Sequence, residues 1–311
     1  MAKYTSLGQI DLPCVADHYG LDQPRLAPLA GGAANSSFHL TCGSGEFVLT
    51  ILDNHDRASA ERLAAHTTAL FDLGMPTTEV VPTQNGSLIA DMAGRPVILK
   101  RWIAGGVEAP LPIRLLPDAG RILATLHTLT ADAPELADLP AGTRRLSPAQ
   151  QATIAEFTDT DFAAWLSERL ERIQTLEATH HRAQVIAHGD LFDDNLIVRP
   201  DGGLSVLDWE TVSLDDPLLD LGMAAVGLAR EDGLLVPERL RALVAGYVEI
   251  APLSEDDLRA LPAEIEHAAL IIAFHRYYRH NVRFPDPAKS TIHTEMIKFV
   301  ESIEHTAQLD S

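Results

Sequence analysis

The sequence predicts an α+β fold of two lobes, with a small N-terminal lobe built on an antiparallel sheet and a larger, mainly helical C-terminal lobe. Three observations predict this class. Short apolar runs separated by glycine turns fill the first hundred residues, which is typical of strands and hairpins. Apolar residues recur at helical spacing from Pro117 onward. The glycine-rich run 101–106 is typical of an interdomain link, so we expect lobes at 1–104 and 105–311.

The N-terminal lobe begins with a predicted helix at 12–19, with Asp11 as a candidate N-cap and Gly20 at its end. A glycine-rich loop at 31–37 follows. Taken alone such a loop is more often just a turn, but its small residues would let backbone N–H groups approach a phosphate. The remaining predicted elements are a hairpin of strands 38–41 and 46–52, a helix at 56–73, and strands at 87–92 and 96–100.

Amphipathic spacing predicts the helices of the C-terminal lobe. They span 118–129, the region from Phe162 to Ile173, and 238–250. His127 lies beside the apolar stripe of the first of these, and we interpret it as a packed core histidine. We expect Pro262 to interrupt the helical pattern after Ser254 and to give two helices there, because proline cannot donate to the helical hydrogen-bond ladder.

The most informative segment is the run His188-Gly189-Asp190-Leu191-Phe192-Asp193-Asp194-Asn195. Two apolar runs follow it, at 196–198 and 204–207, with a turn between them at Arg199-Pro200-Asp201-Gly202-Gly203. This pattern predicts a tight β-hairpin that ends on Asp208. Side chains that carry oxygen ligands therefore lie at both outer ends of the hairpin.

That set of side chains suits phosphoryl transfer. The reaction needs one carboxylate to take the proton of the acceptor hydroxyl, and oxygen ligands to hold magnesium on the nucleotide phosphates. We assign Asp190 as the catalytic base, and Asn195 and Asp208 as magnesium ligands. The alternative is a surface loop before an ordinary hairpin, since Asp and Asn are common in loops. The joint pattern favours catalysis.

Composition restricts the partners of the chain. Its 311 residues, 46% of them hydrophobic, suffice for a sizeable core. The net charge of −20 argues against nucleic acid and anionic membrane surfaces as partners. Cys14 and Cys42 give no disulfide framework, and no signal peptide or apolar membrane span is evident. We expect a cytoplasmic protein whose oligomeric state the sequence leaves open.

The run 188–195, then Asp208, then Asp216-Pro217-Leu218-Leu219-Asp220-Leu221 resembles the signature of the aminoglycoside phosphotransferase/choline kinase family. These are small-molecule kinases with a protein-kinase-like fold. The resemblance implies the same roles for Asp190, Asn195 and Asp208, and it implies that Asp220 is a buried brace for the catalytic loop. We interpret His188 as a residue that orients this loop. The chain has neither a Walker motif nor a dinucleotide-binding fingerprint.

One position departs from most of that family. The second strand of the N-terminal hairpin usually carries a lysine that steadies the nucleotide phosphates, and Thr50 stands in its place here. Type II homoserine kinases, a branch of the family, resemble this chain in having threonine there. The segment 32–38 and the pair Asp194-Asn195 also resemble that branch, whereas Trp209-Glu210 departs from its usual Phe-Tyr pair. Thr50 keeps a non-catalytic nucleotide-binding pseudokinase open as an alternative.

Further contacts follow from position in this fold. The predicted nucleotide contacts are Asn35, Ser36 and Ser37 in the phosphate loop, Thr50, the carbonyl of Arg101 and the N–H of Ile103. On a late helix, Arg276 or Arg279 could bind a substrate carboxylate bidentately. The alternative for these two arginines is a set of salt bridges within the helical lobe.

We therefore expect a kinase that uses ATP and Mg²⁺ to phosphorylate a small alcohol. Homoserine is the leading acceptor, and the alternatives are choline or ethanolamine, an amino sugar and an aminoglycoside. A quaternary ammonium needs an aromatic cage, and only 5% of the chain is aromatic, which disfavours choline. The acidic composition would suit a polycationic antibiotic.

Overall fold

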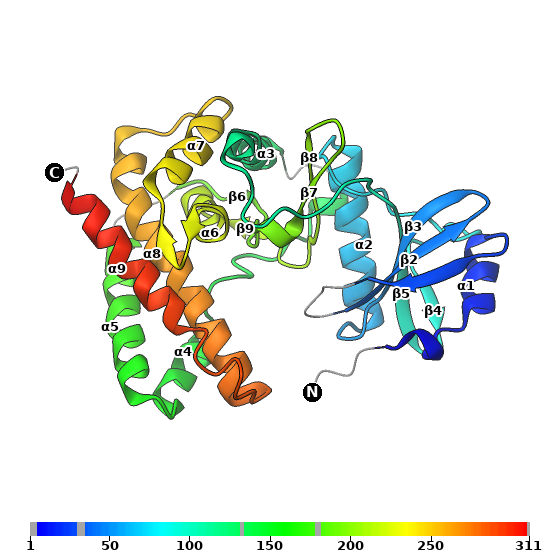
Figure 1. The fold of residues 1–311 in the computed structure, drawn as a ribbon, viewed down its shortest axis with the longest axis horizontal. Helices are drawn as coiled ribbons and strands as arrows, with labels where there is room; N and C mark the ends of the chain where they lie inside the picture. The colour runs from blue at the N-terminus through cyan, green and yellow to red at the C-terminus, as the bar shows by residue number, and fades with distance from the viewer. Residues whose placement is uncertain (1–4, 30–34, 131–133, 178–181, 310–311) are drawn as a thin grey trace. The chain divides into compact units, whose positions relative to one another are not determined.

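The computed structural model describes residues 5–29, 35–130, 134–177 and 182–309, without the side chains of 135 and 304–309. The chain forms two compact units, traced by colour from the N-terminus to the C-terminus in Figure 1. The first unit comprises Met1–Gly106, Asp132–Ala137 and Ile197–Glu210, and the second comprises Val107–Ala131, Asp138–Leu196 and Thr211–Ser311. Of the described helices, none has the length and apolar character that a membrane crossing requires.

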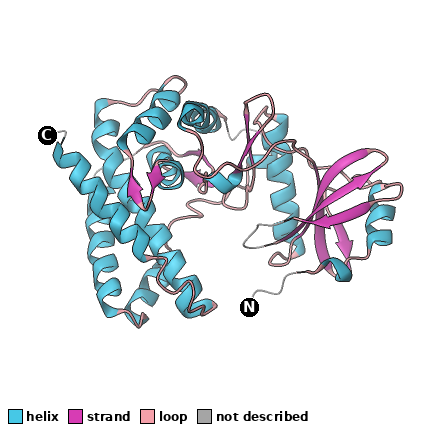
Figure 2. Ribbon diagram, in the orientation of Figure 1, coloured by secondary structure: helices cyan, strands magenta, loops and turns pink. Residues whose placement is uncertain are grey.

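The first unit is built on a five-stranded antiparallel sheet of order β1-β2-β3-β5-β4, drawn in magenta in Figure 2. The predicted hairpin is confirmed, because β2 and β3 pair from Ser36↔Ile51 to Cys42↔Gly45. The predicted strand 87–92 is shorter than expected, because residues 83–87 close a turn through the bond from Thr83 N to Ser87 O. The strands are β1 (Arg25–Pro28), β2 (Ser36–Cys42), β3 (Gly45–Ile51), β4 (Ala90–Met92) and β5 (Arg95–Arg101).

Two helices, α1 (Leu12–Tyr19) and α2 (Arg57–Asp72), cover opposite faces of this sheet (Figure 1). Both begin where the sequence predicts, at aspartate N-caps whose carboxylates accept a backbone N–H at 3.0 Å and 2.8 Å. Val15 and Tyr19 of α1 pack on the face that carries Leu49 and Leu99. The opposite face presents Ile98 to α2, so the direction of each β5 side chain is fixed by the core it joins.

The hairpin of β7 (Leu196–Val198) and β8 (Leu204–Val206) has the predicted form. From Ile197 on it belongs to the first unit, whereas the sequence places it in a lobe at 105–311. Val198 pairs with Gly106, and Val206 is bonded through its N–H to Pro76 and through its carbonyl to the Thr77 hydroxyl. Beside the hairpin, position 105 requires glycine. The φ of Gly105 is +137°, and a Cβ there would lie 2.2 Å from the Val198 backbone oxygen.

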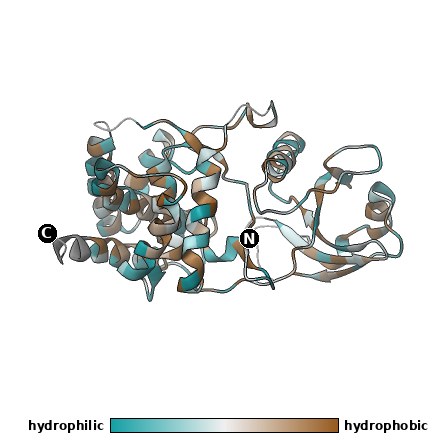
Figure 3. Ribbon diagram, turned by 90° about the horizontal axis from the view of Figure 1, so that it is seen from above, coloured by the Kyte–Doolittle hydropathy of each residue, from teal (hydrophilic) through white to brown (hydrophobic). Residues whose placement is uncertain are grey.

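The second unit is mainly helical, and hydrophobic and hydrophilic residues alternate along its helices in Figure 3, as in amphipathic helices. Helix α6 is buried along nearly its whole length and packs against α8. The helices are α3 (Leu116–Thr128), α4 (Pro148–Thr153), α5 (Thr160–Glu177), α6 (Pro217–Leu228), α7 (Pro237–Val248), α8 (Glu255–Tyr277) and α9 (Thr294–Leu309).

Short elements complete the chain. Two small sheets in the second unit pair β6 (Val185–Ala187) with β9 (Ser213–Asp215) and β10 (Arg230–Glu231) with β11 (Leu234–Leu235). The single-turn helices are η1 (Leu7–Gln9), η2 (Ile113–Leu115), η3 (Pro134–Leu136), η4 (Ile154–Glu156), η5 (Asp193–Asn195) and the π-helical η6 (Tyr278–Arg283).

The prediction that Pro262 divides a helix is wrong, because α8 runs without a break through that residue. Proline removes one intrahelical hydrogen bond, at a cost of about 3 kcal/mol. The part of α8 that follows is almost completely buried from Ile265 to Phe274, and each buried aliphatic side chain contributes about 1.5–3 kcal/mol. Burial of this segment therefore outweighs the local defect and keeps the helix continuous.

Candidate active site

The segment from His188 to Asn195 lies between β6 and β7, and a buried carboxylate holds its start. Asp220 lies in the first turn of α6 and is 3% exposed. Its Oδ2 accepts a hydrogen bond from His188 N, and its Oδ1 accepts one from Gly189 N, both at 2.7 Å. The two bonds fix the backbone immediately before Asp190.

Asp220 is itself held by His127 of α3, and Tyr247 of α7 in turn holds His127. His127 Nε2 lies 3.0 Å from Asp220 Oδ2, and His127 Nδ1 lies 2.7 Å from the Tyr247 hydroxyl. Burial alone would raise the pKa of Asp220, but the His127 hydrogen bond and charge, with the loop amides, bring it below its ordinary value. Asp220 is therefore an anion inside the unit, and the prediction of His127 as a packed core histidine is confirmed.

The loop then folds into the single turn η5, which brings Asp190 and Asn195 together. Asn195 Nδ2 donates to the backbone oxygen of Asp190 at 2.8 Å and approaches its Oδ2 at 3.4 Å. The Asp190 side chain is 28% exposed, so solvent and solutes can reach its carboxylate. Among the hydrogen bonds of the described residues, none uses Oδ1 of Asn195.

Arg144 is a site residue that the sequence reasoning missed. Its Nη2 donates to Oδ1 of Asp190 at 2.9 Å, from a segment 46 residues earlier in the chain. Its Nε is buried and has no partner within the described part of the chain. The pKa of nearby His275 is lowered to about 4 by burial and by the Arg144 charge, so this ring is neutral at pH 7. The only signal in the sequence is the adjacent pair Arg144-Arg145.

In the first unit, Asp208 follows β8 in an uncommon conformation. Its φ is +62°, a left-handed value that costs a non-glycine residue on the order of 1–2 kcal/mol. Buried Trp209 anchors the next position, since its Nε1 donates to the Thr77 hydroxyl at 2.9 Å. Oδ1 of Asp208 accepts from the Glu210 N–H at 3.2 Å. Strain of this kind persists where surrounding contacts enforce it, and it is frequent at functional sites.

Glu210 and Lys100 add charge around Asp208. The Glu210 carboxylate accepts from Asn35 Nδ2 and lies 3.6 Å from His55 Nε2. Burial lowers the pKa of Lys100, an effect that the carboxylates of Asp208 and Glu210 oppose. The sequence reasoning did not select Lys100, because a single lysine at the end of a strand carries no motif.

The predicted phosphate-loop residues divide between the two faces of the sheet. The hydroxyls of Ser37 and Thr50 lie 3.2 Å apart on one face. The Ser36 hydroxyl is buried on the other face, where it donates to Asp53 at 2.6 Å and accepts from Thr5 N. Strand alternation thus makes the Ser36 side chain a structural contact on that face. The predicted residues 31–34 lie outside the described residues.

At the predicted adenine contact, the carbonyl of Arg101 accepts from the Thr78 hydroxyl at 2.7 Å, which leaves it one lone pair. None of the hydrogen bonds among described residues uses the Ile103 N–H. Next to them, the rings of His39 and Trp102 are in contact, with centroids 4.2 Å apart and planes tilted by 32°. Backbone groups for a planar base are therefore present at this end of β5.

Of the two late-helix arginines, Arg276 has partners within its own unit. Arg276 Nη1 donates to Glu295 Oε2 at 2.9 Å and to the Ile292 carbonyl at 3.2 Å. Arg279 also has a partner. For Arg276, these contacts favour the alternative that the sequence left open, a salt bridge between α8 and α9.

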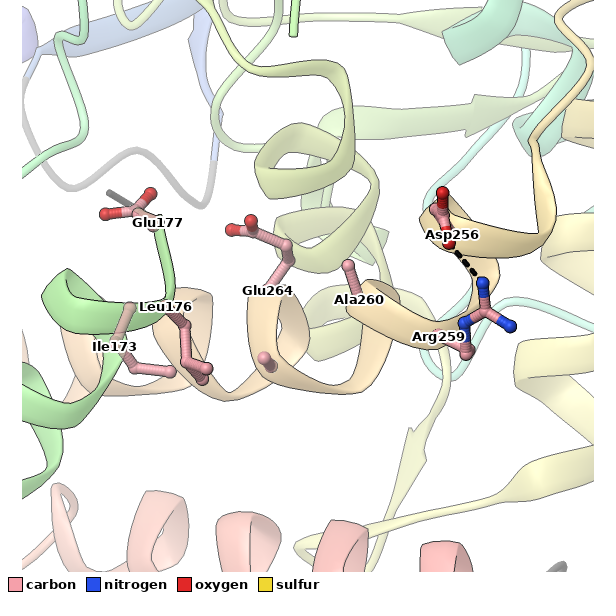
Figure 4. A pocket seen from close by; sticks show the side chains of 8 residues that line it. Ile173, Leu176, Glu177, Asp256, Arg259, Ala260 and Glu264 are labelled. Carbon is pink, nitrogen blue, oxygen red and sulfur yellow. Dashed lines mark hydrogen bonds and ion pairs between the residues drawn. The ribbon is translucent and has the colours of Figure 1, made fainter. Parts of the chain in front are cut away.

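A second acidic cluster lines a cavity of about 260 Å³ in the helical unit. Figure 4 shows Glu177 and Glu264 side by side in its wall. With His267 they offer ligand atoms within 4.8 Å of one another. However, Nη1 of Arg145 lies 2.7 Å from Oε1 of Glu177, and Nη1 of Arg182 lies 3.2 Å from Oε1 of Glu264. Burial lowers the pKa of His267, but both glutamates raise it above its ordinary value overall. In this structure the cluster is therefore an ion-pair network.

Comparison with known proteins identifies the family. The family model described as the phosphotransferase enzyme family matches residues 25–253. The chain belongs to this family. As a member of the phosphotransferase enzyme family it is an enzyme that transfers a phosphoryl group, which confirms the predicted class of activity.

One relative and two structures illustrate this membership. A homoserine kinase from Methylobacillus flagellatus is 25% identical over 284 residues, which cover 90% of this chain and 87% of that protein. The structure of an amicoumacin kinase with AMP-PNP and Ca²⁺ has a TM-score of 0.68 at 15% identity, with 96% and 95% of the chains covered. A microcompartment-associated aminopropanol kinase has a TM-score of 0.67 at 18% identity, with 96% and 98% covered. These similarities confirm the kinase-like fold.

Proposed function

We propose that this phosphotransferase transfers the γ-phosphoryl group of ATP to the hydroxyl of a small hydroxy amino acid, with homoserine as the leading acceptor. The observation that carries the proposal is the pairing of Arg144 with Asp190. A carboxylate that can take a hydroxyl proton lies beside a guanidinium that can bind a carboxylate. The similarity to a homoserine kinase along nine-tenths of the chain supports the same acceptor.

Asp190 is the proposed catalytic base. Its backbone is held on one side by Asp220 through Gly189 N and on the other by the Asn195 amide. A base positioned in this way keeps its carboxylate within hydrogen-bond reach of an acceptor hydroxyl, which is the condition for proton transfer. His188 and Asp220 are proposed to orient the loop and not to touch the substrate.

Asn195 and Asp208 are the proposed ligands of a magnesium ion. The donor set fits this metal, since an amide oxygen and a carboxylate are hard oxygen ligands. The Asn195 amide is oriented by its Nδ2 bond to Asp190, which turns its oxygen away from that contact. When bound, the ion neutralises charge on the phosphates of the nucleotide. The amicoumacin kinase structure contains a divalent cation with an ATP analogue, which agrees with this requirement.

The nucleotide is proposed to bind the first unit. Ser37 and Thr50 offer hydroxyls on one sheet face, and Asn35, immediately before β2, offers its backbone N–H. The Arg101 carbonyl and the Ile103 N–H supply the acceptor and the donor for adenine. Backbone groups at these positions serve whatever the side chain, so the proposal depends on strand position alone.

Arg144 is the proposed ligand of the acceptor's carboxylate. Only its Nη2 is bonded to Asp190, and its buried Nε has no described partner. A guanidinium has five donors, so it can hold the catalytic base and a substrate carboxylate at once. Arg276 is not assigned this role, because Glu295 already pairs with it.

Two other readings remain as competing proposals. An alcohol without a carboxylate, such as aminopropanol, choline, ethanolamine, an amino sugar or an aminoglycoside, would leave the Arg144 donors unused. A non-catalytic nucleotide-binding protein would explain Thr50, but it gives no physical reason for the base, its brace and the oxygen ligands together.

ADP release across a panel of acceptors tests the proposal. The panel contains L-homoserine, its methyl ester, aminopropanol, choline, glucosamine and an aminoglycoside, each with MgATP. We expect release with L-homoserine and at least a tenfold lower kcat/KM with the ester, since losing a charged hydrogen bond costs about 1.5–3 kcal/mol. Release only with acceptors that lack a carboxylate would refute the hydroxy amino acid. MgATP binding without release in any assay would support the non-catalytic reading.

A further inference from the structure

The sheet of the first unit offers a cation beside the position where the usual lysine is missing. Thr50 pairs with Ile98, and two residues along the same strands Val48 pairs with Lys100. Side chains directly opposite in an antiparallel pair point to the same face. Lys100 therefore shares a face with Thr50 and is its diagonal neighbour, at a separation of about 7 Å.

We propose that Lys100 binds the nucleotide phosphates and so replaces, from strand β5, the lysine that Thr50 cannot supply. This inference rests on the proposed kinase function. The flexible four-carbon stem of lysine can bridge the distance to a diagonal neighbour, and its ammonium group is a compact donor for phosphate oxygens. A threonine hydroxyl at position 50 can add one hydrogen bond but no charge.

The groups around Lys100 fit an ammonium that meets anions. The carboxylates of Asp208 and Glu210 interact electrostatically with it. Asp208 is also the proposed metal ligand, so a lysine acting on it lies where metal-bound phosphates are expected. Glu210 is tied to Asn35, immediately before β2, which places this charge cluster beside the end of the phosphate loop. In the free protein the two carboxylates more than offset the lysine charge.

Three arginines of the first unit contact other groups of that unit. Arg101 stacks over the Phe47 ring, with its Cζ 5.0 Å from the ring centroid, on the opposite face of the sheet. Arg95 donates to the Thr5 hydroxyl, and Arg57 pairs with Glu61 on the surface of α2. Lys100 is also the only lysine among the described residues of this unit. Lys100 lies on the face that carries Thr50 and Ser37, and Arg25, opposite Thr41 on strand β1, lies farther along the same face.

A purely structural role for Lys100, neutralising Asp208 and Glu210, makes a different prediction. It would affect thermal stability and the binding of every nucleoside ligand alike. A phosphate ligand would affect only those ligands that carry phosphates. Comparison of ATP with adenosine therefore separates the two roles, because adenosine shares the base and the ribose but has no charge.

The test compares Lys100→Met with wild type in equilibrium titrations of MgATP and adenosine. The matched control is Lys298→Met, at an exposed position of α9. We expect MgATP affinity to fall about 10- to 100-fold in Lys100→Met, the loss of one charged hydrogen bond. Adenosine affinity should change less than about twofold, and the control should behave as wild type. Equal losses for both ligands, or no loss for either, would overturn the inference.

Two further results distinguish a failure of the proposed function from a failure of the role proposed for Lys100. A wild-type protein that binds no MgATP refutes the proposed function, whereas MgATP binding unaffected by Lys100→Met refutes only the role of Lys100. If Lys100→Met does not fold, amine acetylation of wild type followed by mass spectrometry gives the answer. ATP should protect Lys100 and adenosine should not, with Lys298 as the internal reference. Equal modification of Lys100 under both conditions contradicts the proposal.

Discussion

Arg144 donates from Nη2 to Oδ1 of Asp190 at 2.9 Å, across 46 residues of sequence. The contact joins a loop before α4 to the loop after β6 within one unit. Both side chains are partly exposed, at 18% and 28%, so neither is sealed inside the core. The pair therefore places a carboxylate beside a guanidinium at a position that solutes can reach.

Arg144→Met should raise the KM for L-homoserine about 10- to 100-fold, because a charged hydrogen bond to the acceptor is lost. The KM for ATP should stay within about twofold, since Arg144 does not belong to the proposed nucleotide contacts. Steady-state kinetics measures both KM values. The control is Arg241→Met, at an exposed position of α7. An unchanged KM for homoserine, with a normal fold, would count against the carboxylate role.

Asp190→Asn should lower kcat by about 10²- to 10⁴-fold, because the amide cannot accept the hydroxyl proton. Asparagine keeps the size of the side chain, so ATP affinity should remain that of wild type. Asp201→Asn in the exposed hairpin turn is the matched control. Turnover close to the wild-type rate in Asp190→Asn would exclude the residue as the base.

Asp208→Asn should remove most of the dependence of ATP binding on magnesium, because one anionic oxygen ligand becomes neutral. The measurement is the ratio of ATP affinities with magnesium and with EDTA, for variant and wild type. Affinity in EDTA should be unchanged or higher, since a negative charge near the phosphates is lost. A variant that gains as much affinity from magnesium as wild type would not have lost a metal ligand.

Glu177→Gln should reduce stability above pH 4.5 and flatten its acid dependence. Burial opposes ionisation of Glu177, but His267 and Arg145 lower its pKa from 4.5 to about 2. A carboxylate whose pKa is lower in the folded than in the unfolded state stabilises the fold at pH values above the unfolded pKa. This contribution is lost as the pH falls from about 4.5 to 2. The shift corresponds to an upper limit on the order of 3 kcal/mol.

Urea unfolding between pH 2.5 and 7 measures this effect, with exposed Glu171→Gln on the same helix as the control. His267 contributes in the opposite sense, because its raised pKa stabilises the fold below pH 6.5 and that contribution is lost as pH rises through the folded value. If wild type and Glu177→Gln show parallel pH curves, the ion-pair network does not control acid stability.

Local patterns in the sequence were good guides to the elements. Helix α1 has the predicted ends, because Asp11 caps it and Gly20 adopts a left-handed φ of +64°. The hairpin after Asn195 formed as predicted, since turn residues and alternating apolar residues act over a few positions. Pro262 shows the limit of such reasoning, because burial of the following helix outweighed a local defect.

The sequence by itself determined the family signature from His188 to Asp220 and the type of chemistry, because spacing along one loop and one hairpin is a short-range property. It also determined that position 50 has no cation. Tertiary structure alone decided that Arg144 contacts Asp190 and that Lys100 shares a sheet face with Thr50. Such neighbours come from segments far apart in the chain, and packing and strand register, not local spacing, bring them together.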